Sequence, residues 1–292
     1  MKIQLLKIVI LLTSYMPLKV AHCIGVFIGW VYQVKPSKMK YVAGVNIKRC
    51  FPELNEEQQA TMLNKTLIET GKLLSEMGIM WGRPAASVLQ LVKSVEGEEY
   101  IHDAMSRGTG VLLAMPHTGS WELTALYCAR HFPMTTLYRP PKLKGFDSKI
   151  RKARQRTGAE LVPTDVKGVR ALAKALSNGR MAGLLPDQEP GKGNGLFAPF
   201  FNIAAYTTTL LPRLAIKYDC QVVYAIAERL PYGRGFKLIF RPASDGFHDK
   251  DLQQATELMN RDVEELVRLH PEQYQWIYKR FNTQPEGEPF IY

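Results

Sequence analysis

The chain has 292 residues, of which 46% are hydrophobic and 22% are charged, and its formal net charge is +11. This apolar content excludes an intrinsically disordered protein, and the length suits one large domain with or without a helical appendage. The positive charge indicates an acidic partner, which leaves open nucleic acid, anionic lipid, a phosphorylated substrate and an acidic protein. The four cysteines form no CxxC pair, so we expect reduced thiols in a cytoplasmic compartment.

The apolar N-terminus predicts a membrane anchor over residues 1–34, followed by one further domain over 35–292. Its two apolar runs, 8–18 and 20–34, are each shorter than the ~20 residues of a spanning helix. Pro17 lies at their junction and would kink or break a single helix, while the flanking lysines and aromatic residues suit a membrane interface. We expect either one kinked or tilted span or a helix that lies in the interface. The alternative is a buried helical hairpin of the globular core.

The segment after the anchor is predicted to be helical from Asn55. Residues 45–52 form a short connector, and Asn55 with Gln58 resembles a capping box that opens a helix. A second helix is expected over 98–107, with Gly108 at its C-terminal cap.

From residue 111 onward, predicted strands and helices alternate. The expected strands are 111–115, 135–138, 160–162, 181–185, 221–227 and 236–240. The expected helices are 121–130, 149–156, 169–176, 207–218 and 251–270. This alternation predicts an α/β fold with a mixed, largely parallel sheet flanked by helices. Residues 187–206 have no regular pattern, and loops of that length in a compact domain tend to be functional.

Polar residues suited to chemistry follow three of the predicted strands. His117 follows the first, Arg139 follows the second, and Asp187 and Gln188 follow a third. Ligands of open α/β sheets bind outside the carboxyl ends of the strands, so we expect these side chains to gather at one edge. No nucleophile elbow, P-loop, dinucleotide-binding fingerprint or metal-ligand motif is present, and no metal or cofactor site is predicted.

His117 and Glu122 flank a predicted strand–helix turn. Helical positions five apart lie roughly 140° apart around the axis, so a cooperating pair needs His117 in the turn and Glu122 in the first helical turn. Gly119 would loosen the turn and Ser120 would be the N-cap. An ionised Glu122 would then hold one imidazole nitrogen and leave the other free to accept a proton. The alternative is a satisfied histidine beside a helix start.

A dense basic run begins at the predicted edge. Eight lysines and arginines lie between Arg139 and Arg156, with Asp147 as the one acidic residue among them. A solvated helix face is the common explanation of such a run, but its place beside the predicted site favours contact with phosphate or an acidic protein. The run has few aromatic residues for base stacking, which argues against nucleic acid.

Blocks of residues spread over almost the whole chain resemble a known family. The sequence HTGSWE at 117–122 is similar to the HX4D/E motif of the lysophospholipid acyltransferase superfamily. The chain as a whole resembles the late acyltransferases of bacterial lipid A biosynthesis, of the lauroyl/myristoyl type. The matching blocks are 46–53, 117–122, 138–140, 187–188, 197–201, 270–276 and 279–281.

This resemblance implies a glycerolipid-acyltransferase-like fold and a reaction. The family transfers a fatty acyl chain from acyl carrier protein to a hydroxyl of an anionic lipid A precursor. The reaction takes place at the cytoplasmic face of the inner membrane and needs no cofactor. By resemblance, His117 is the general base and Glu122 orients it. Arg139 binds a phosphate or stabilises developing negative charge, and Asp187 and Gln188 are substrate-binding residues of the third block.

Other interpretations stay open at the sequence level. The acceptor is alternatively another lipid, such as a lysophospholipid, a glycolipid mannoside or an aminolipid. A membrane-attached binding protein without catalysis is the non-enzymatic alternative. The apolar residues Phe197, Phe200, Phe201 and Ile203 line an acyl groove or form ordinary core.

Overall fold

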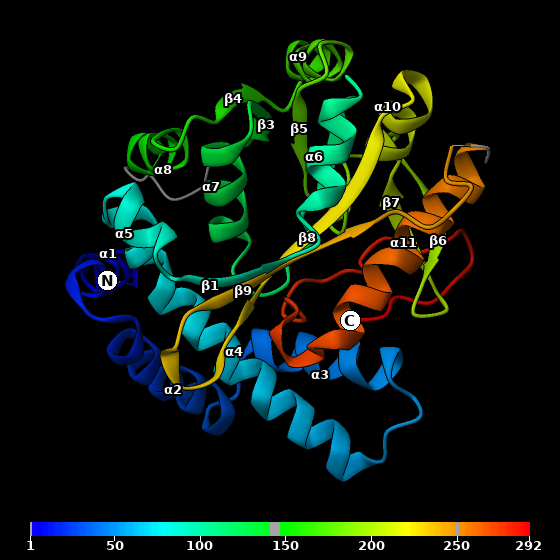
Figure 1. Ribbon diagram of the computed structural model, residues 1–292. Coiled ribbons are helices and arrows are strands. Elements are labelled where there is room, and N and C mark those ends of the chain that lie inside the picture. Colours follow the sequence, from blue (N-terminus) through cyan, green and yellow to red (C-terminus); the bar gives the residue numbers. More distant parts are fainter. Residues whose placement is uncertain (1, 141–146, 249–250) are drawn as a thin grey trace.

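A computed structural model describes residues 2–140, 147–248 and 251–292. Its centre is a seven-stranded sheet of order β1-β9-β8-β2-β5-β3-β4 (Figure 1). Neighbouring strands are parallel except for the antiparallel β8 and β9, which confirms the predicted mixed, largely parallel sheet. The strands are β1 (Val92–Glu96), β2 (Val111–Ala114), β3 (Met134–Tyr138), β4 (Glu160–Pro163), β5 (Met181–Leu184), β8 (Gln221–Arg229) and β9 (Phe236–Pro242).

Helices cover both faces of the sheet, and β2 shows why. Successive side chains of a strand point to opposite faces. Val111 and Leu113 pack with α6 (Glu99–Ser106) and α7 (Trp121–His131), whereas Leu112 and Ala114 pack in a second cluster on the other face. Helices that contribute to that second cluster include α9 (Val166–Ser177), α10 (Leu210–Tyr218) and α11 (Leu252–Leu269). All four side chains of β2 are fully buried, so the strand that leads to His117 lies in the centre of the core.

The N-terminal third is a set of packed helices. They are α1 (Lys2–Tyr15), α2 (Leu18–Val34), α3 (Lys38–Cys50) and α4 (Glu56–Gly82), and they lie to the left of and below the sheet in Figure 1. The break around Pro17 and the Asn55–Gln58 capping box are both confirmed. Helices α2 and α4 approach so closely that a Cβ on Gly71 would lie 2.1 Å from the Gly25 carbonyl oxygen. Glycine is therefore required at this crossing.

Helices α1 and α2 combine a packed face with an exposed apolar face. Large hydrophobic side chains on the exposed face include Phe27, which is 62% exposed, and Trp30, which is 52% exposed. Among the side chains of these two helices that the structure describes, the others are Ile8, Leu11, Leu12, Tyr15, Val20, Val26 and Val34. Among the described residues, no helix has the length and hydropathy needed to cross a membrane.

Two predictions about local structure are wrong. Helix α3 occupies most of the segment expected to be a connector, because Val42, Ala43, Ile47 and Cys50 bury one helical face. An antiparallel hairpin of β6 (Gly195–Phe200) and β7 (Ile203–Thr208) begins inside the irregular stretch 187–206 and runs two residues past it, so α10 begins later than predicted. Its two turn residues, Phe201 and Asn202, have φ of 51° and 60°. Such a turn is usually marked by Asn-Gly or Asp-Gly, and phenylalanine gives no such signal.

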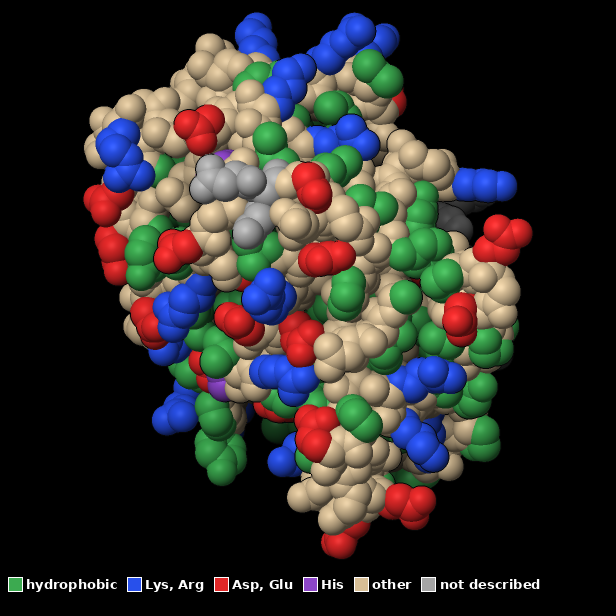
Figure 2. All heavy atoms as spheres, turned by 90° about the vertical axis from the view of Figure 1, so that its right-hand side faces the viewer, with side chains coloured by type: hydrophobic (Ala, Val, Ile, Leu, Met, Phe, Trp, Pro, Cys, Tyr) green, Lys and Arg blue, Asp and Glu red, His purple; other side chains and the backbone are tan. Residues whose placement is uncertain are grey.

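The remaining described elements are short or peripheral. They are α5 (Ala85–Leu89), α8 (Asp147–Gln155) and two 3-10 turns, Pro231–Gly233 and Pro271–Gln273. Figure 2 views the molecule from the side of α10, α11 and the β6–β7 hairpin. Lysine and arginine side chains are interspersed with acidic ones over this face, so it presents no continuous field of one sign.

Candidate functional site

The carboxyl ends of β2, β5 and β3 meet at one edge, as predicted. The three strands are parallel neighbours, and a cavity of about 370 Å³ opens beside them. Four of the predicted site residues line this cavity: His117, Glu122, Arg139 and Gln188. Asp187 lies behind His117 and is only 2% exposed.

Asp187 holds His117 by two hydrogen bonds. The imidazole Nδ1 lies 2.8 Å from Asp187 Oδ1, and the main-chain N–H of His117 donates to Oδ2 at 2.8 Å. Burial opposes ionisation of Asp187, but the imidazole and its hydrogen bonds outweigh burial and lower the pKa of this carboxyl. An ionised carboxylate only accepts hydrogen bonds, so we assign a proton to Nδ1, and in this tautomer Nε2 is the acceptor.

Glu122 does not hold His117, which corrects the prediction from the sequence. It is in the first turn of α7 as expected, but its carboxylate accepts hydrogen bonds from Arg154 of α8, from Nε at 3.0 Å and also from Nη2. Burial disfavours the charge of Glu122, yet Arg154 outweighs burial and lowers the pKa of the carboxyl. Both nitrogens of the His117 ring have other partners, since Nδ1 contacts Asp187 and Nε2 contacts Gln188. The fork of a guanidinium matches a carboxylate better than one ring nitrogen does.

Two glutamines complete the surroundings of the imidazole. Gln188 Nε2 lies 3.2 Å from His117 Nε2 and donates to Gln275 Oε1 at 3.3 Å. The main-chain N–H of Gln275 donates to the carbonyl of His117 at 3.0 Å. The indole of Trp121 packs edge-on against the imidazole, with 4.9 Å between ring centroids. The ring is therefore fixed in orientation, with Nδ1 held by buried Asp187 and Nε2 next to Gln188, which lines the cavity.

The turn after His117 depends on Gly119, as predicted. Gly119 has φ +60°, and a Cβ there would lie 2.0 Å from the carbonyl oxygen of Ala227 on β8. That same oxygen accepts a hydrogen bond from the Ser120 N–H at 2.9 Å. Ser120 is at the N-cap position, but its side chain makes no capping hydrogen bond. The turn is thus pressed against the neighbouring strand, where only glycine fits.

Arg139 and the apolar residues give the cavity its mixed character. Arg139 follows β3, is exposed, and contributes to the cavity lining together with Leu185, Leu210 and Leu211. Phe200 and Phe201 belong to the hydrophobic core at 1% and 3% exposure, so for these two residues the core interpretation is correct. Among the described residues, no cluster of three or more His, Cys, Asp or Glu side chains has a metal-binding arrangement.

The family model for bacterial lipid A biosynthesis acyltransferases matches residues 2–283 of the chain. The chain belongs to this family. It is 29% identical to the lipid A biosynthesis lauroyltransferase of Escherichia coli K12, over 97% of this chain and 92% of the relative. It is 28% identical to the palmitoleoyltransferase of the same organism, over 95% of this chain and 90% of the relative. Identity to the E. coli myristoyltransferase is 24%, over 84% and 75% of the two chains.

In this lipid A acyltransferase, the structure adds residues that the sequence prediction did not assign to the site. Arg154 belongs to the basic run 139–156 and pairs with Glu122. Gln275 lies in the block 270–276 and contacts both Gln188 and the carbonyl of His117. Arg229 donates from Nη2 to the carbonyl oxygen of Gly119 at 2.8 Å. No local pattern marks these partners, because each reaches the site through tertiary contacts from a distant segment.

Proposed function

We propose that this lipid A biosynthesis acyltransferase moves a fatty acyl chain from acyl carrier protein to a hydroxyl of the lipid A precursor. The observation that carries the proposal is the arrangement of His117, which lines the cavity with Nδ1 held by buried Asp187 and Nε2 beside Gln188. An imidazole held in this way is suited to remove a proton from a substrate hydroxyl.

In the proposed reaction, His117 takes one proton from the acceptor and later returns it to the leaving group. His117 Nε2 takes the proton of the acceptor hydroxyl as the oxygen attacks the thioester carbonyl, and Asp187 stabilises the imidazolium that forms. The tetrahedral intermediate then collapses, the carbon–sulfur bond breaks, and the imidazolium returns the proton to the leaving thiolate. Gln188 must give up its contact with Nε2, at 3.2 Å, when the hydroxyl binds there. The reaction produces an ester and the free thiol of the carrier.

The positive charge and the apolar surface of the cavity support the proposed substrates, an anionic lipid and an acyl chain. Exposed Arg139 at the cavity is placed to meet a phosphate of the acceptor, and the leucines beside it suit an acyl chain. The ion pair of Glu122 with Arg154 joins α7 to α8 beside the cavity, so we assign Glu122 a positioning role. The exposed apolar face of α1 and α2 suits contact with the cytoplasmic face of the inner membrane.

The test is a transfer assay with the full-length protein in detergent. Acyl carrier thioesters of defined chain length and a lipid A precursor are the substrates, and mass spectrometry identifies the product. His117→Ala is expected to lower the rate of acyl transfer ~10²–10⁴-fold, because a general base contributes an acceleration of that size. His102→Ala, at an exposed histidine of α6, is the matched control and is expected to retain the native rate. A native rate in His117→Ala, or acylation of a lysophospholipid in place of the precursor, would overturn the proposal.

A further inference from the structure

Arg229 is a buried charge that the reaction scheme does not use. It is the last residue of β8, and its side chain is 3% exposed. Its Nη2 donates a hydrogen bond of 2.8 Å to the carbonyl oxygen of Gly119, two residues after His117. The guanidinium therefore contacts the backbone of the turn that carries the imidazole, without touching the imidazole itself.

The same arginine closes a ring of hydrogen bonds around the turn. Its main-chain N–H donates to Gln273 Oε1 at 2.8 Å, and Gln273 Nε2 donates to its carbonyl at 3.2 Å. The N–H of Gly119 donates in turn to the main-chain carbonyl of Gln273 at 3.1 Å. The catalytic turn, the end of β8 and the C-terminal segment are thus tied to one another at one point.

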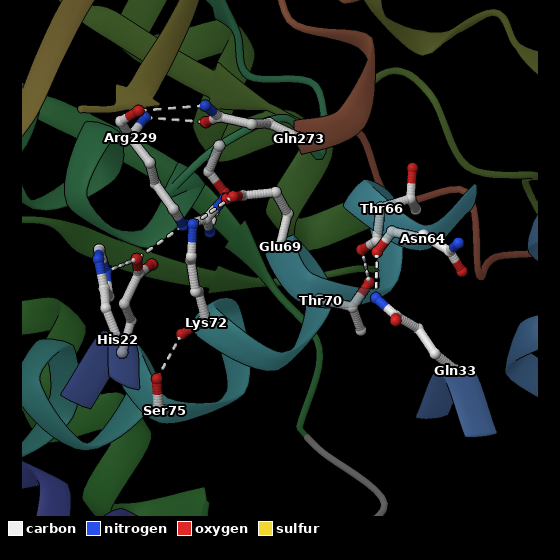
Figure 3. A network of polar contacts seen from close by, with 12 residues as sticks. His22, Gln33, Asn64, Thr66, Glu69, Thr70, Lys72, Ser75, Arg229 and Gln273 are labelled. Atoms are coloured by element: carbon white, nitrogen blue, oxygen red, sulfur yellow. Dashed lines mark hydrogen bonds and ion pairs between the residues drawn. The ribbon is translucent and has the colours of Figure 1, made fainter. Parts of the chain in front are cut away.

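Acidic residues of α4 hold the guanidinium in place (Figure 3). Arg229 Nε lies 2.6 Å from Glu76 Oε1, and Nη1 lies 3.6 Å from Glu69 Oε2. Burial lowers the pKa of Arg229, but Glu76 and Glu69 outweigh it and raise the pKa above its ordinary value. Glu76 is 1% exposed and also contacts His22 Nε2 of α2 at 2.6 Å. The chain of contacts runs from α2 through α4 to the turn.

Buried ion pairs add little net stability compared with apolar packing, and their best-supported use is to fix one arrangement. A guanidinium presents several donors in a rigid fork, so Arg229 reaches acceptors on two elements at once. Gly119 is the acceptor on the catalytic side, and its left-handed backbone is pressed against Ala227. A small loss of restraint at this carbonyl would move His117 relative to the cavity.

We propose that Arg229 is a positioning residue that holds the His117 turn through the Gly119 carbonyl, with Glu76 and His22 as its support. The inference rests on the proposed role of His117 as general base. Removal of the guanidinium displaces the imidazole from its reactive geometry and leaves the substrate-binding cavity intact. The effect therefore falls on kcat, while KM for both substrates is preserved.

Two variants of the full-length protein test the inference. Arg229→Gln is expected to lower kcat about 100-fold with KM within about twofold, since small misplacements of a catalytic group have effects of that order. Hydrogen exchange of the peptide that contains residues 117–121 is expected to become faster. Arg229→Lys keeps a charge opposite Glu76 but lacks the fork, so we expect it to fold and still to show the low kcat and the faster exchange.

A matched control separates positioning from general destabilisation. Asp262 is a buried carboxylate of α11 whose Oδ2 accepts from the Ser244 N–H at 3.2 Å, away from the turn. Asp262→Ala removes the acceptor of the Ser244 N–H and Oγ–H, so it is expected to lower the melting temperature and leave kcat and exchange over 117–121 unchanged. A kcat within about twofold of native in Arg229→Lys, or unchanged exchange over 117–121 in that variant, would overturn the inference. If the native protein transfers no acyl group, the proposed function fails, but the exchange measurement still decides the positioning role.

Discussion

The chemistry of His117 depends on which carboxylate holds its ring. The local pattern of strand, glycine turn and helix placed His117 and Glu122 correctly, because these features lie within six residues of one another. The predicted partner of the ring, Glu122, is wrong. The ring contacts Asp187, which is 70 positions away, and Glu122 pairs with Arg154, which is 32 positions away. Such pairings follow from side-chain geometry between elements that are distant in the sequence, which one sequence does not reveal. The sequence did predict that Asp187 and His117 would share an edge.

Asp187→Asn tests this assignment at the residue scale. An amide at this position can donate to Nδ1, so the ring is expected to carry its proton on Nε2, where a base must be free. We expect kcat to fall ~10²–10⁴-fold with the fold retained, as for other histidines that lose their orienting carboxylate. The measurement is the rate of acyl transfer together with circular dichroism. Asp103→Asn, at an exposed position of α6, is the control, and equal rates in the two variants would contradict the assignment.

Elements with strong periodicity were predicted, and those defined by tertiary contacts were not. The strands β2, β3 and β5 and the helix α11 match their predicted ranges within a few residues. The edge strand β1 was missed because two of its five side chains are exposed and its sequence, VKSVE, has no continuous apolar run. The hairpin of β6 and β7 was missed because its turn contains Phe201 in a left-handed conformation.

At the scale of elements, the exposed apolar face of α2 makes a testable prediction. Phe27 and Trp30 lie side by side, with 5.9 Å between ring centroids. Full burial of one large apolar side chain is worth about 1.5–3 kcal/mol. Partial insertion of each ring into a membrane is therefore expected to raise the affinity of the protein for that membrane several-fold. Phe27→Ser combined with Trp30→Ser is expected to weaken binding to vesicles of anionic phospholipid at least about 10-fold in a sedimentation assay.

The control for this experiment lies on another helix. Val166 of α9 is 67% exposed, so Val166→Ser removes apolar surface without altering α1 or α2. We expect its vesicle binding to equal that of the native protein. Equal binding by the α2 double variant would show that this face does not contact the membrane.

The whole molecule closes around the site through contacts between its two ends. Asn46 of α3 donates to the carbonyls of Trp276 at 2.7 Å and Tyr278 at 2.8 Å. The hydroxyl of Tyr292 donates to Asn46 Oδ1 at 2.6 Å. These partners are 230 or more positions apart, so no local pattern predicted them. The segment from Gln273 to Tyr278 is held against α3 on one side and against the His117 turn on the other.

Stability of the whole molecule is expected to fall at acidic pH, because three of its buried carboxyls have lowered pKa values. Asp187, Glu122 and Glu76 keep their charges in the fold through His117, Arg154 and Arg229. A carboxyl whose pKa is lower in the folded state stabilises the fold above its unfolded pKa, near 4, and this contribution is lost as pH falls through the folded pKa. The buried carboxyl of Asp262 has a raised pKa and acts in the opposite direction.

Glu122→Gln isolates one of these carboxyls. Each extra proton bound on unfolding changes the free energy of unfolding by about 1.4 kcal/mol per pH unit. We expect the variant to be less stable than the native protein at pH 7, because Arg154 loses its partner. Its stability should also fall less steeply below pH 5, so that the two curves converge in acid. Urea unfolding in detergent from pH 3 to 7 measures both. Glu288→Gln, at an exposed position, should follow the native curve, and a Glu122→Gln curve parallel to the native one would refute the linkage.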